Sequence, residues 1–155
     1  VSSHALKQHR SWGVCFDGAI FTNLTPEHLD YHPDMNDYFH SKAMLFREYP
    51  EFAFKNGKKK FIASINLGSP YGEKLLKSLE AAKKSYLSIH SYMGSDYKSS
   101  ENGVSGRIGS EVFQSPLQGS FNAENIASVI SLFHGAGLSD SVIAQGIQSL
   151  KGVPG

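Results

Sequence analysis

The chain has 155 residues, of which 40% are hydrophobic and 19% charged, and its formal net charge at pH 7 is +1. This length fits one domain with a single core, and the small charge argues against nucleic-acid or anionic-membrane partners. Cys15 is the only cysteine, which excludes an intramolecular disulfide and a thiolate zinc cluster. Because no apolar stretch could cross a bilayer and no signal peptide is visible, we expect a cytoplasmic protein.

The first half of the chain predicts strands alternating with helices. The apolar, partly β-branched run over 14–24 indicates a strand buried on both faces. A helix over 34–49 follows, and its apolar stripe at steps of three and four contains Met35, Tyr38, Lys42, Leu45, Phe46 and Tyr49. A strand over 61–66, a helix over 70–82 capped by Ser69, and a strand over 86–90 complete this half.

The second half is less regular at first. The Ser- and Gly-rich segment 91–106 indicates a loop or a pair of short hairpins, and 107–114 alternates weakly like a strand. A helix over 122–134 places Ile126, Val129, Ile130 and Phe133 on one face. A last helix begins at Ser139 and carries Val142, Ile143, Ile147 and Leu150. The whole pattern predicts an α/β fold with a mostly parallel sheet flanked by helices.

The densest polar cluster directly follows the first predicted strand and consists of Asn23, Glu27, His28, Asp30 and His32. Ligands of open parallel sheets bind beyond the carboxyl ends of strands, where this segment should lie. Its oxygens could hold magnesium, and its imidazoles could hold zinc. The spacing alone favours a plainer interpretation, a polar loop whose His and Asp side chains cap the next helix.

Lys42 lies on the apolar stripe of its helix, where a charged amine is costly unless it is paired or neutralised. One interpretation is a lysine whose stem is buried and whose amine reaches the rim of the core. The other is a desolvated lysine with a lowered pKa, present partly as the free amine. Such an amine can react with carbon dioxide to form a carbamate, an anionic ligand suited to magnesium.

Several segments of the chain together resemble the central domain of the Mur ligases. They are residues 1–6, residues 21–32 with Lys42, and then 69–76, 119–125 and 152–155, in the family's order. The similarity covers nearly the whole chain. It is most specific at 27–32, with Lys42 fourteen residues after His28. The nearest branch is MurE, which adds the third residue to the UDP-N-acetylmuramoyl peptide.

This resemblance implies a metal site. His28 would be a ligand of the magnesium ion that bridges the ATP γ-phosphate and the substrate carboxylate, and Lys42 would be carbamylated and support that ion. Asp30 and His32 belong to the same motif, but the resemblance assigns them no direct role.

The resemblance also implies binding residues for both large substrates. Ser2, Gln8 and Arg10 match positions that hold the UDP-N-acetylmuramoyl dipeptide. Arg10 suits this role because a guanidinium can bind a carboxylate or phosphate in a bidentate way, although a surface arginine without a partner is the plainer interpretation. Asn122 and Asn125 match the helix start that meets the adenine of ATP.

The implied reaction is amide formation. ATP would phosphorylate the terminal glutamyl carboxylate, and the amine of an incoming amino acid, expected to be a diamino acid, would attack the acyl phosphate. Because two anions meet in the first step, magnesium and cationic side chains must screen their repulsion.

The same resemblance marks what the sequence lacks. No phosphate-binding loop of the Gly-x-x-x-x-Gly-Lys-Ser/Thr type occurs. The family's usual magnesium-binding Glu would precede Val1, and its C-terminal domain would follow Gly155. Residues 66–69 replace a more acidic family segment, a change expected in a surface loop. We therefore expect 1–155 to be a partial central domain, without its N-terminal domain, phosphate-loop segment and C-terminal domain, and inactive as a ligase on its own.

Other functions compete with the MurE assignment. A relative such as folylpolyglutamate synthetase or another Mur ligase is one, and Ser2, Gln8 and Arg10 favour MurE over it. A non-catalytic module that keeps the fold to bind a nucleotide or a partner is another. A histidine-metal hydrolase built on His4, His28, Asp30 and His32 would lack an evident nucleophile and leave Lys42 unexplained.

Overall fold

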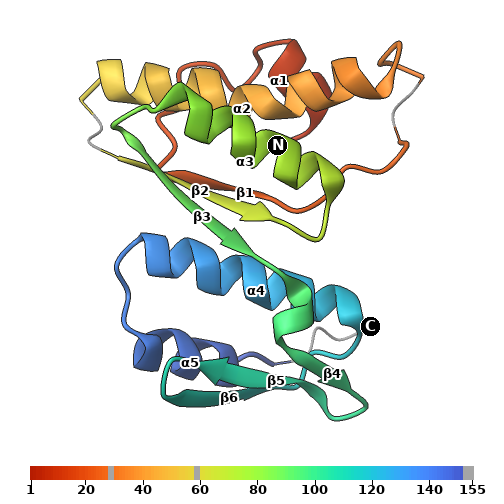
Figure 1. The fold of residues 1–155 in the computed structure, drawn as a ribbon, viewed down its shortest axis with the longest axis vertical. Helices are drawn as coiled ribbons and strands as arrows, with labels where there is room; N and C mark the ends of the chain where they lie inside the picture. Colours follow the sequence, from red (N-terminus) through yellow and green to blue (C-terminus); the bar gives the residue numbers. More distant parts are fainter. Residues whose placement is uncertain (28–29, 58–59, 152–155) are drawn as a thin grey trace.

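The computed structural model describes residues 1–27, 30–57 and 60–151 (Figure 1). Its helices and strands run in chain order as α1 (Ser3–Lys7), β1 (Gly18–Phe21), α2 (Met35–Lys55), β2 (Phe61–Asn66), α3 (Pro70–Ala82), β3 (Leu87–Tyr92), the short 3-10 helix η1 (Gly94–Asp96), β4 (Lys98–Ser100), β5 (Gly103–Ile108), β6 (Glu111–Ser115), α4 (Ser120–Gly135) and α5 (Asp140–Gln148). No helix in these three ranges is long and apolar enough to cross a membrane.

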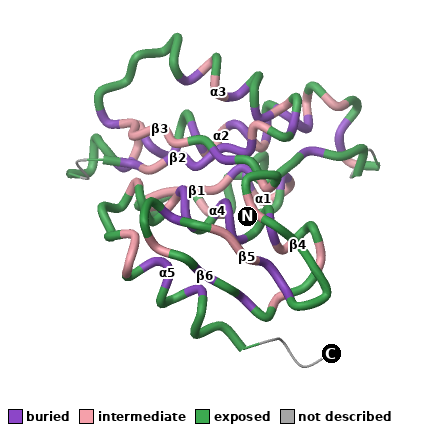
Figure 2. The backbone as a smooth tube through the Cα atoms, turned by 60° about the horizontal axis from the view of Figure 1, so that its bottom comes forward, coloured by how far each residue is buried: buried purple, intermediate pink, exposed green. Residues whose placement is uncertain are grey.

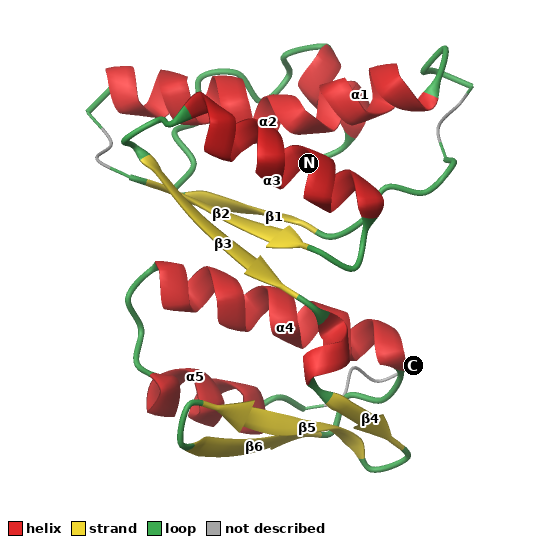
Figure 3. Ribbon diagram, in the orientation of Figure 1, coloured by secondary structure: helices red, strands yellow, loops and turns green. Residues whose placement is uncertain are grey.

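Two separate sheets organise the molecule (Figure 3). β1, β2 and β3 form a parallel sheet in that order, with Ile20 opposite Ser64 and Ser64 opposite His90. β4, β5 and β6 form an antiparallel sheet. The predicted α/β class with a parallel sheet is therefore confirmed. The β4–β5 pair agrees with a short hairpin in 91–106, and the sequence did not predict that β6 extends it into a sheet.

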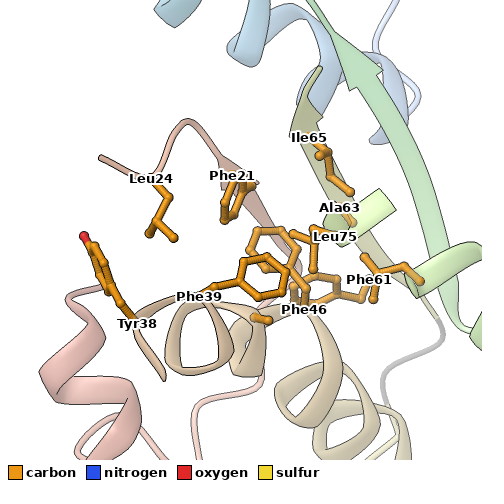
Figure 4. Packing of buried hydrophobic residues seen from close by; sticks show 11 residues of the cluster. Phe21, Leu24, Tyr38, Phe39, Phe46, Phe61, Ala63, Ile65 and Leu75 are labelled. Carbon is orange, nitrogen blue, oxygen red and sulfur yellow. The ribbon is translucent and has the colours of Figure 1, made fainter. Parts of the chain in front are cut away.

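The larger core lies between the parallel sheet and helices α2 and α3. Aromatic and aliphatic side chains from both layers fill it, among them Phe21, Phe39, Phe46, Ile65 and Leu75 (Figure 4). Leu24, just beyond β1, and Tyr38 lie at one end of this core in the same view. Burying such side chains is the main force that holds the helices against the sheet.

A second core lies between α4, α5 and the antiparallel sheet. Its buried members include Val104, Phe113, Ile126, Ile130 and Ile147. Helix α4 also contacts the parallel sheet on the side opposite α2 and α3 (Figure 1). Figure 2 shows that buried positions along α4 alternate with exposed ones. This helix therefore joins the two halves of the molecule.

Two predicted elements of the first half have different bounds. Only Gly18–Phe21 of the predicted strand 14–24 pairs with β2, because Val14 is exposed and Leu24 packs into the core from the loop beyond the strand. This strand lies at one edge of the sheet, and β2 is the strand with mainly buried residues. Helix α2 continues to Lys55 through Pro50, because burial of Pro50 and Ala53 stabilises turns that proline disfavours.

The second half of the molecule also differs from the sequence prediction. The expected strand over 107–114 is a hairpin, which turns at Gly109, with a φ of 57°, between β5 and β6. On α4, Ile126 and Ile130 are buried as expected, but Val129 and Phe133 are exposed because the core contacts lie on the neighbouring stripe. On the last helix Ile143 and Ile147 are buried, whereas the other two residues of the predicted stripe, Val142 and Leu150, are exposed.

Candidate functional site

The parallel topology places several polar segments at one edge of the first sheet. Helices α2 and α3 each follow a strand of this sheet, so both begin at the edge where β1, β2 and β3 end (Figure 1). Helix α4 begins there too, because η1, directly after β3, approaches its first turn so closely that a Cβ on Gly94 would lie 2.4 Å from Cγ of Glu124. This edge is where open α/β sheets bind ligands.

The buried side-chain amide of Asn66 fixes the backbone directly after β1. The Nδ2 atom of Asn66 donates to the carbonyl of Thr22 at 2.8 Å, and its Oδ1 accepts from the backbone of Gly68 at 2.8 Å. Asn66 ends β2, and the turn that follows it leads into α3; Gly68 in this turn is exposed, whereas Asn66 and Ser69 are buried, so the segment expected to be a surface loop is only partly at the surface. The polar segment predicted to carry the metal site begins directly beyond Thr22. His28, the predicted metal ligand in this segment, lies outside the described residues.

Lys42 projects from the second turn of α2 and is half-buried. Burial lowers the pKa of its amine, and the carboxylate of Glu27 partly opposes this effect. The Nζ atom lies 6.0 Å from the ring centroid of Tyr38, one turn earlier in the helix. Burial and the same Glu27 raise the pKa of the Tyr38 hydroxyl. The lowered pKa and the partial burial show an amine that is partly desolvated, and the role of Lys42 stays a prediction.

A buried imidazole connects α1 to α2. The Nδ1 atom of His32 donates to Oδ2 of Asp37 at 2.6 Å, and its Nε2 lies 2.8 Å from Oγ of Ser3. The same Asp37 oxygen accepts from Nζ of Lys7 at 2.6 Å. Lys7 and His32 together hold the pKa of the Asp37 carboxyl below its ordinary value. We call Ser3, His32 and Asp37 the buried triad.

The order of groups in the buried triad is that of a serine hydrolase, but its surroundings are not. Ser3 and His32 are completely buried, so no substrate carbonyl could reach the Ser3 hydroxyl. Both ring nitrogens of His32 are already engaged, which also removes it as a metal ligand. Among the described residues, no three His, Cys, Asp or Glu side chains are arranged to hold a metal ion. His28, another residue of the histidine-metal hydrolase alternative, lies outside the described residues, so the structure bears on that alternative only through the engaged ring of His32.

The predicted substrate residues of the N-terminal segment surround α1. Ser2 caps its start, with Oγ accepting from the backbone N–H of Ala5 at 3.2 Å, and Gln8 caps its end. The Nε2 atom of Gln8 donates to the hydroxyl of Tyr31 at 3.3 Å. Arg10 is exposed beyond the helix. The structure thus brings Ser2 and Gln8 together on one short helix beside the buried triad.

The two predicted adenine residues lie in the first turns of α4, across the sheet from α2. The Nδ2 atom of Asn122 donates to the carbonyl of Gln118 at 2.6 Å, and Asn125 donates to Oδ1 of Asn122 at 3.4 Å. Phe121 directly precedes Asn122 in the chain, and its side chain is largely exposed. An exposed ring beside two amides offers stacking and hydrogen bonding to a base.

Sequence reasoning missed four residues that shape this site: Ser3, Tyr31, Asp37 and Asn66. Each acts through a side-chain contact to a partner on another segment. No periodic pattern reports such a contact. The one available signal was the position of Ser3 and Tyr31 beside residues that the sequence did single out.

Comparison with known proteins identifies relatives of this chain. A family model described as the Mur ligase middle domain matches residues 1–133. Ligases named UDP-N-acetylmuramoyl-L-alanyl-D-glutamate–2,6-diaminopimelate ligase are similar to the whole chain. The protein from a Nostoc species is 40% identical over 163 aligned positions, and that from Geobacter metallireducens is 42% identical over 161. The chain covers 31% of the length of each.

Solved structures agree on the fold. A crystal structure of MurF from Acinetobacter baumannii superposes on 90% of the chain with a TM-score of 0.69 and 14% sequence identity. Another crystal structure of MurF from that organism gives a TM-score of 0.66 at 15% identity. In both cases the matched region is 30% of the solved chain.

Proposed function

The chain belongs to the Mur ligase middle-domain family, and on this premise we propose that it forms part of a MurE-type, ATP-dependent ligase of peptidoglycan synthesis. The ligase adds an amino acid to UDP-N-acetylmuramoyl-L-alanyl-D-glutamate, and the names of the relatives favour diaminopimelate as that amino acid. The observation that carries the proposal is the half-buried Lys42, whose amine pKa is lowered beside the segment that leaves β1. Because the chain covers 31% of these relatives, activity is proposed for the full-length protein.

The proposed reaction has two steps. An oxygen of the glutamyl carboxylate attacks the γ-phosphorus of ATP, which forms an acyl phosphate and releases ADP. The amine of the incoming amino acid then attacks the carbonyl carbon, and the tetrahedral adduct expels phosphate and leaves an amide. The chain's own contribution is to position the two substrates and to manage charge, because a carboxylate must approach a triphosphate.

In this proposal Lys42 is converted to a carbamate, which supports a cation between the two anionic substrates. The lone pair of its amine attacks carbon dioxide, a C–N bond forms, and the nitrogen releases a proton. A lowered pKa favours this step because the free amine is the reacting form. The product has two oxygens that share one negative charge, and with the nearby Glu27 carboxylate they form a donor set that fits a hard cation such as magnesium. His28 would complete the protein ligands, and a bound magnesium ion would neutralise charge on the phosphate and carboxylate.

The remaining residues bind the substrates. Ser2, Gln8 and Arg10 hold the UDP-linked dipeptide from α1 and the turn after it. Asn122 and Asn125 meet the adenine of ATP at the start of α4. Because α2 and α4 cover opposite faces of the sheet and begin at the same edge, the two substrates approach the carboxyl ends of the strands from both faces.

Lys42→Ala in the full-length ligase tests the proposal. Turnover of ATP in the presence of both co-substrates should fall by at least about a hundredfold, because the metal loses an anionic support. Short-chain carboxylic acids should restore part of the rate. Intact-mass measurement in bicarbonate should detect one added carbon dioxide only in the wild-type protein.

Lys74→Ala is the matched control, since the Lys74 amine also lies over a ring, 4.5 Å from the Phe39 centroid, but this residue is exposed on α3 and its amine donates to Asn36. It should retain normal activity. Unchanged turnover in Lys42→Ala would remove this lysine from the mechanism, and a wild-type protein without ligase activity would overturn the proposed function.

A further inference from the structure

We propose that Ser3, His32 and Asp37, the buried triad, act as positioning residues that fix α1 on α2 and so orient the binding groups for the UDP-linked peptide. This inference rests on the proposed function, in which Ser2 and Gln8 bind that substrate. It assigns a role to His32 that the resemblance leaves open.

The first support is the geometry of α1. The helix has only five residues, too few to be stable in isolation, so contacts with the rest of the chain must hold it in place. Its two cap residues, Ser2 and Gln8, are the proposed substrate contacts. Any displacement of the helix therefore moves both contacts together. The placement of α1 is a direct determinant of substrate affinity.

The second support is the way the helix is held. Ser3, its first residue, is completely buried, and its hydroxyl lies 2.8 Å from Nε2 of the equally buried His32. The opposite ring nitrogen donates to Asp37 in the first turn of α2. At the far end of α1, Lys7 pairs with the same Asp37 carboxylate at 2.6 Å. One carboxylate on α2 therefore fixes both ends of α1.

The third support is continuity with the proposed metal site. The His32 ring stacks on Tyr38, with 5.0 Å between centroids and 20° between planes. The Nζ atom of Lys42 also approaches this Tyr38 ring, at 6.0 Å from its centroid. The residue before His32, Tyr31, packs its ring 3.8 Å from that of His4 on α1. The buried triad thus sets the distance between the peptide-binding helix and the helix that carries Lys42.

Asp37 lies in a first turn of α2 that further hydrogen bonds hold in place. Its backbone N–H donates to the side chain of Asp34, the N-cap of α2, at 2.8 Å. The backbone carbonyl of Asp37 accepts from Ser41 one turn later. The carboxylate that receives His32 is therefore attached to a capped first turn, which limits how far α1 can move relative to α2.

Ser3→Ala in the full-length protein tests this inference, with Ser64→Ala as the matched control. Both serines are fully buried, and the Ser64 hydroxyl also makes one hydrogen bond, to the backbone of Ser128, far along the chain from α1. The dissociation constants of the UDP-linked dipeptide and of a non-hydrolysable ATP analogue are measured by calorimetry. Ser3→Ala should weaken dipeptide binding about tenfold or more and leave analogue binding within about twofold, because small misplacement of binding groups is costly. Ser64→Ala should change neither.

Asp37→Asn provides a second variant that keeps the side-chain shape. It should weaken dipeptide binding in the same direction, and the double variant with Ser3→Ala should show less than the product of the two effects, since both act through His32. The inference would be overturned by any of three results. The triad variants could weaken binding of both ligands equally, Ser64→Ala could weaken dipeptide binding as much as they do, or both triad variants could leave dipeptide binding unchanged. A wild-type protein that binds the dipeptide without turning it over would overturn the proposed function alone, and one that does not bind it would overturn both.

Discussion

The contact between α3 and the end of β2 provides a sharp test of how this site is built. Gly72 lies buried in the first turn of α3, where an added Cβ would be 1.8 Å from the carbonyl oxygen of Asn66. Because carbon–oxygen contacts rarely fall below about 3.3 Å, Gly72→Ala requires a shift of about 1.5 Å. Overpacking of this kind costs about 1–3 kcal/mol. Gly146→Ala on α5 is the matched control, since its Cβ meets nothing within 4 Å.

The two substitutions should act in opposite directions on the free energy of unfolding. Gly146→Ala should gain about 0.5–1 kcal/mol from helix propensity, without a steric cost. With a urea dependence of about 2 kcal/mol per molar, the midpoint should fall by about 0.5–1.5 M in Gly72→Ala and rise by about 0.25–0.5 M in Gly146→Ala. Urea denaturation followed by circular dichroism measures both. A rise of similar size in the two variants would refute the close approach of Gly72 to Asn66.

Two further predictions concern the core and the buried triad. Leu75→Ala should lower the free energy of unfolding by about 2–5 kcal/mol, because this side chain is completely buried between α3 and the sheet; a loss below about 1 kcal/mol would contradict that packing. Asp37 has a native pKa below its ordinary value of 3.8, so its ionised form stabilises the fold above that value, and this contribution is lost as the pH falls through the native pKa. The difference in urea midpoint between wild type and Asp37→Asn should therefore be constant above about pH 5 and shrink at lower pH, and a difference that grows on acidification would contradict the ion pair.

The sequence predicted the helices and the parallel strands because their signals are local. The apolar stripe of α2, the proline that opens α3 and the turn residues between strands each report on a few neighbouring residues. The antiparallel sheet was harder to predict. Its strands are short and rich in Ser and Gly, and Val104 and Phe113 become core residues only by packing against Ile126 and Ile130 of α4.

The site shows the same division between local and distant signals. Lys42 was identifiable because a charged residue interrupts an apolar stripe, and the described structure gives its amine a lowered pKa. The contact of Ser3 with His32 joins positions 29 residues apart. Neither the periodicity nor the composition of either segment records that pairing. The interaction depends on how α1 docks on α2, which is a property of the folded chain.

The second core determines where the proposed nucleotide residues lie. The chain leaves the parallel sheet after β3, forms β4 to β6, and only then enters α4, so no short turn from a strand of the parallel sheet fixes the start of that helix. Two contacts replace such a turn: the close approach of Gly94 to Glu124, and the packing of Ile126 and Ile130 on the antiparallel sheet. A Cβ at Gly94 would lie 2.4 Å from Cγ and 3.0 Å from Cα of Glu124, so glycine at this position allows η1 to pack closely against α4. The small sheet therefore holds Asn122 and Asn125 at the edge where β1 ends, and the proposed transfer of a phosphoryl group from ATP to a bound peptide needs both substrates at one edge.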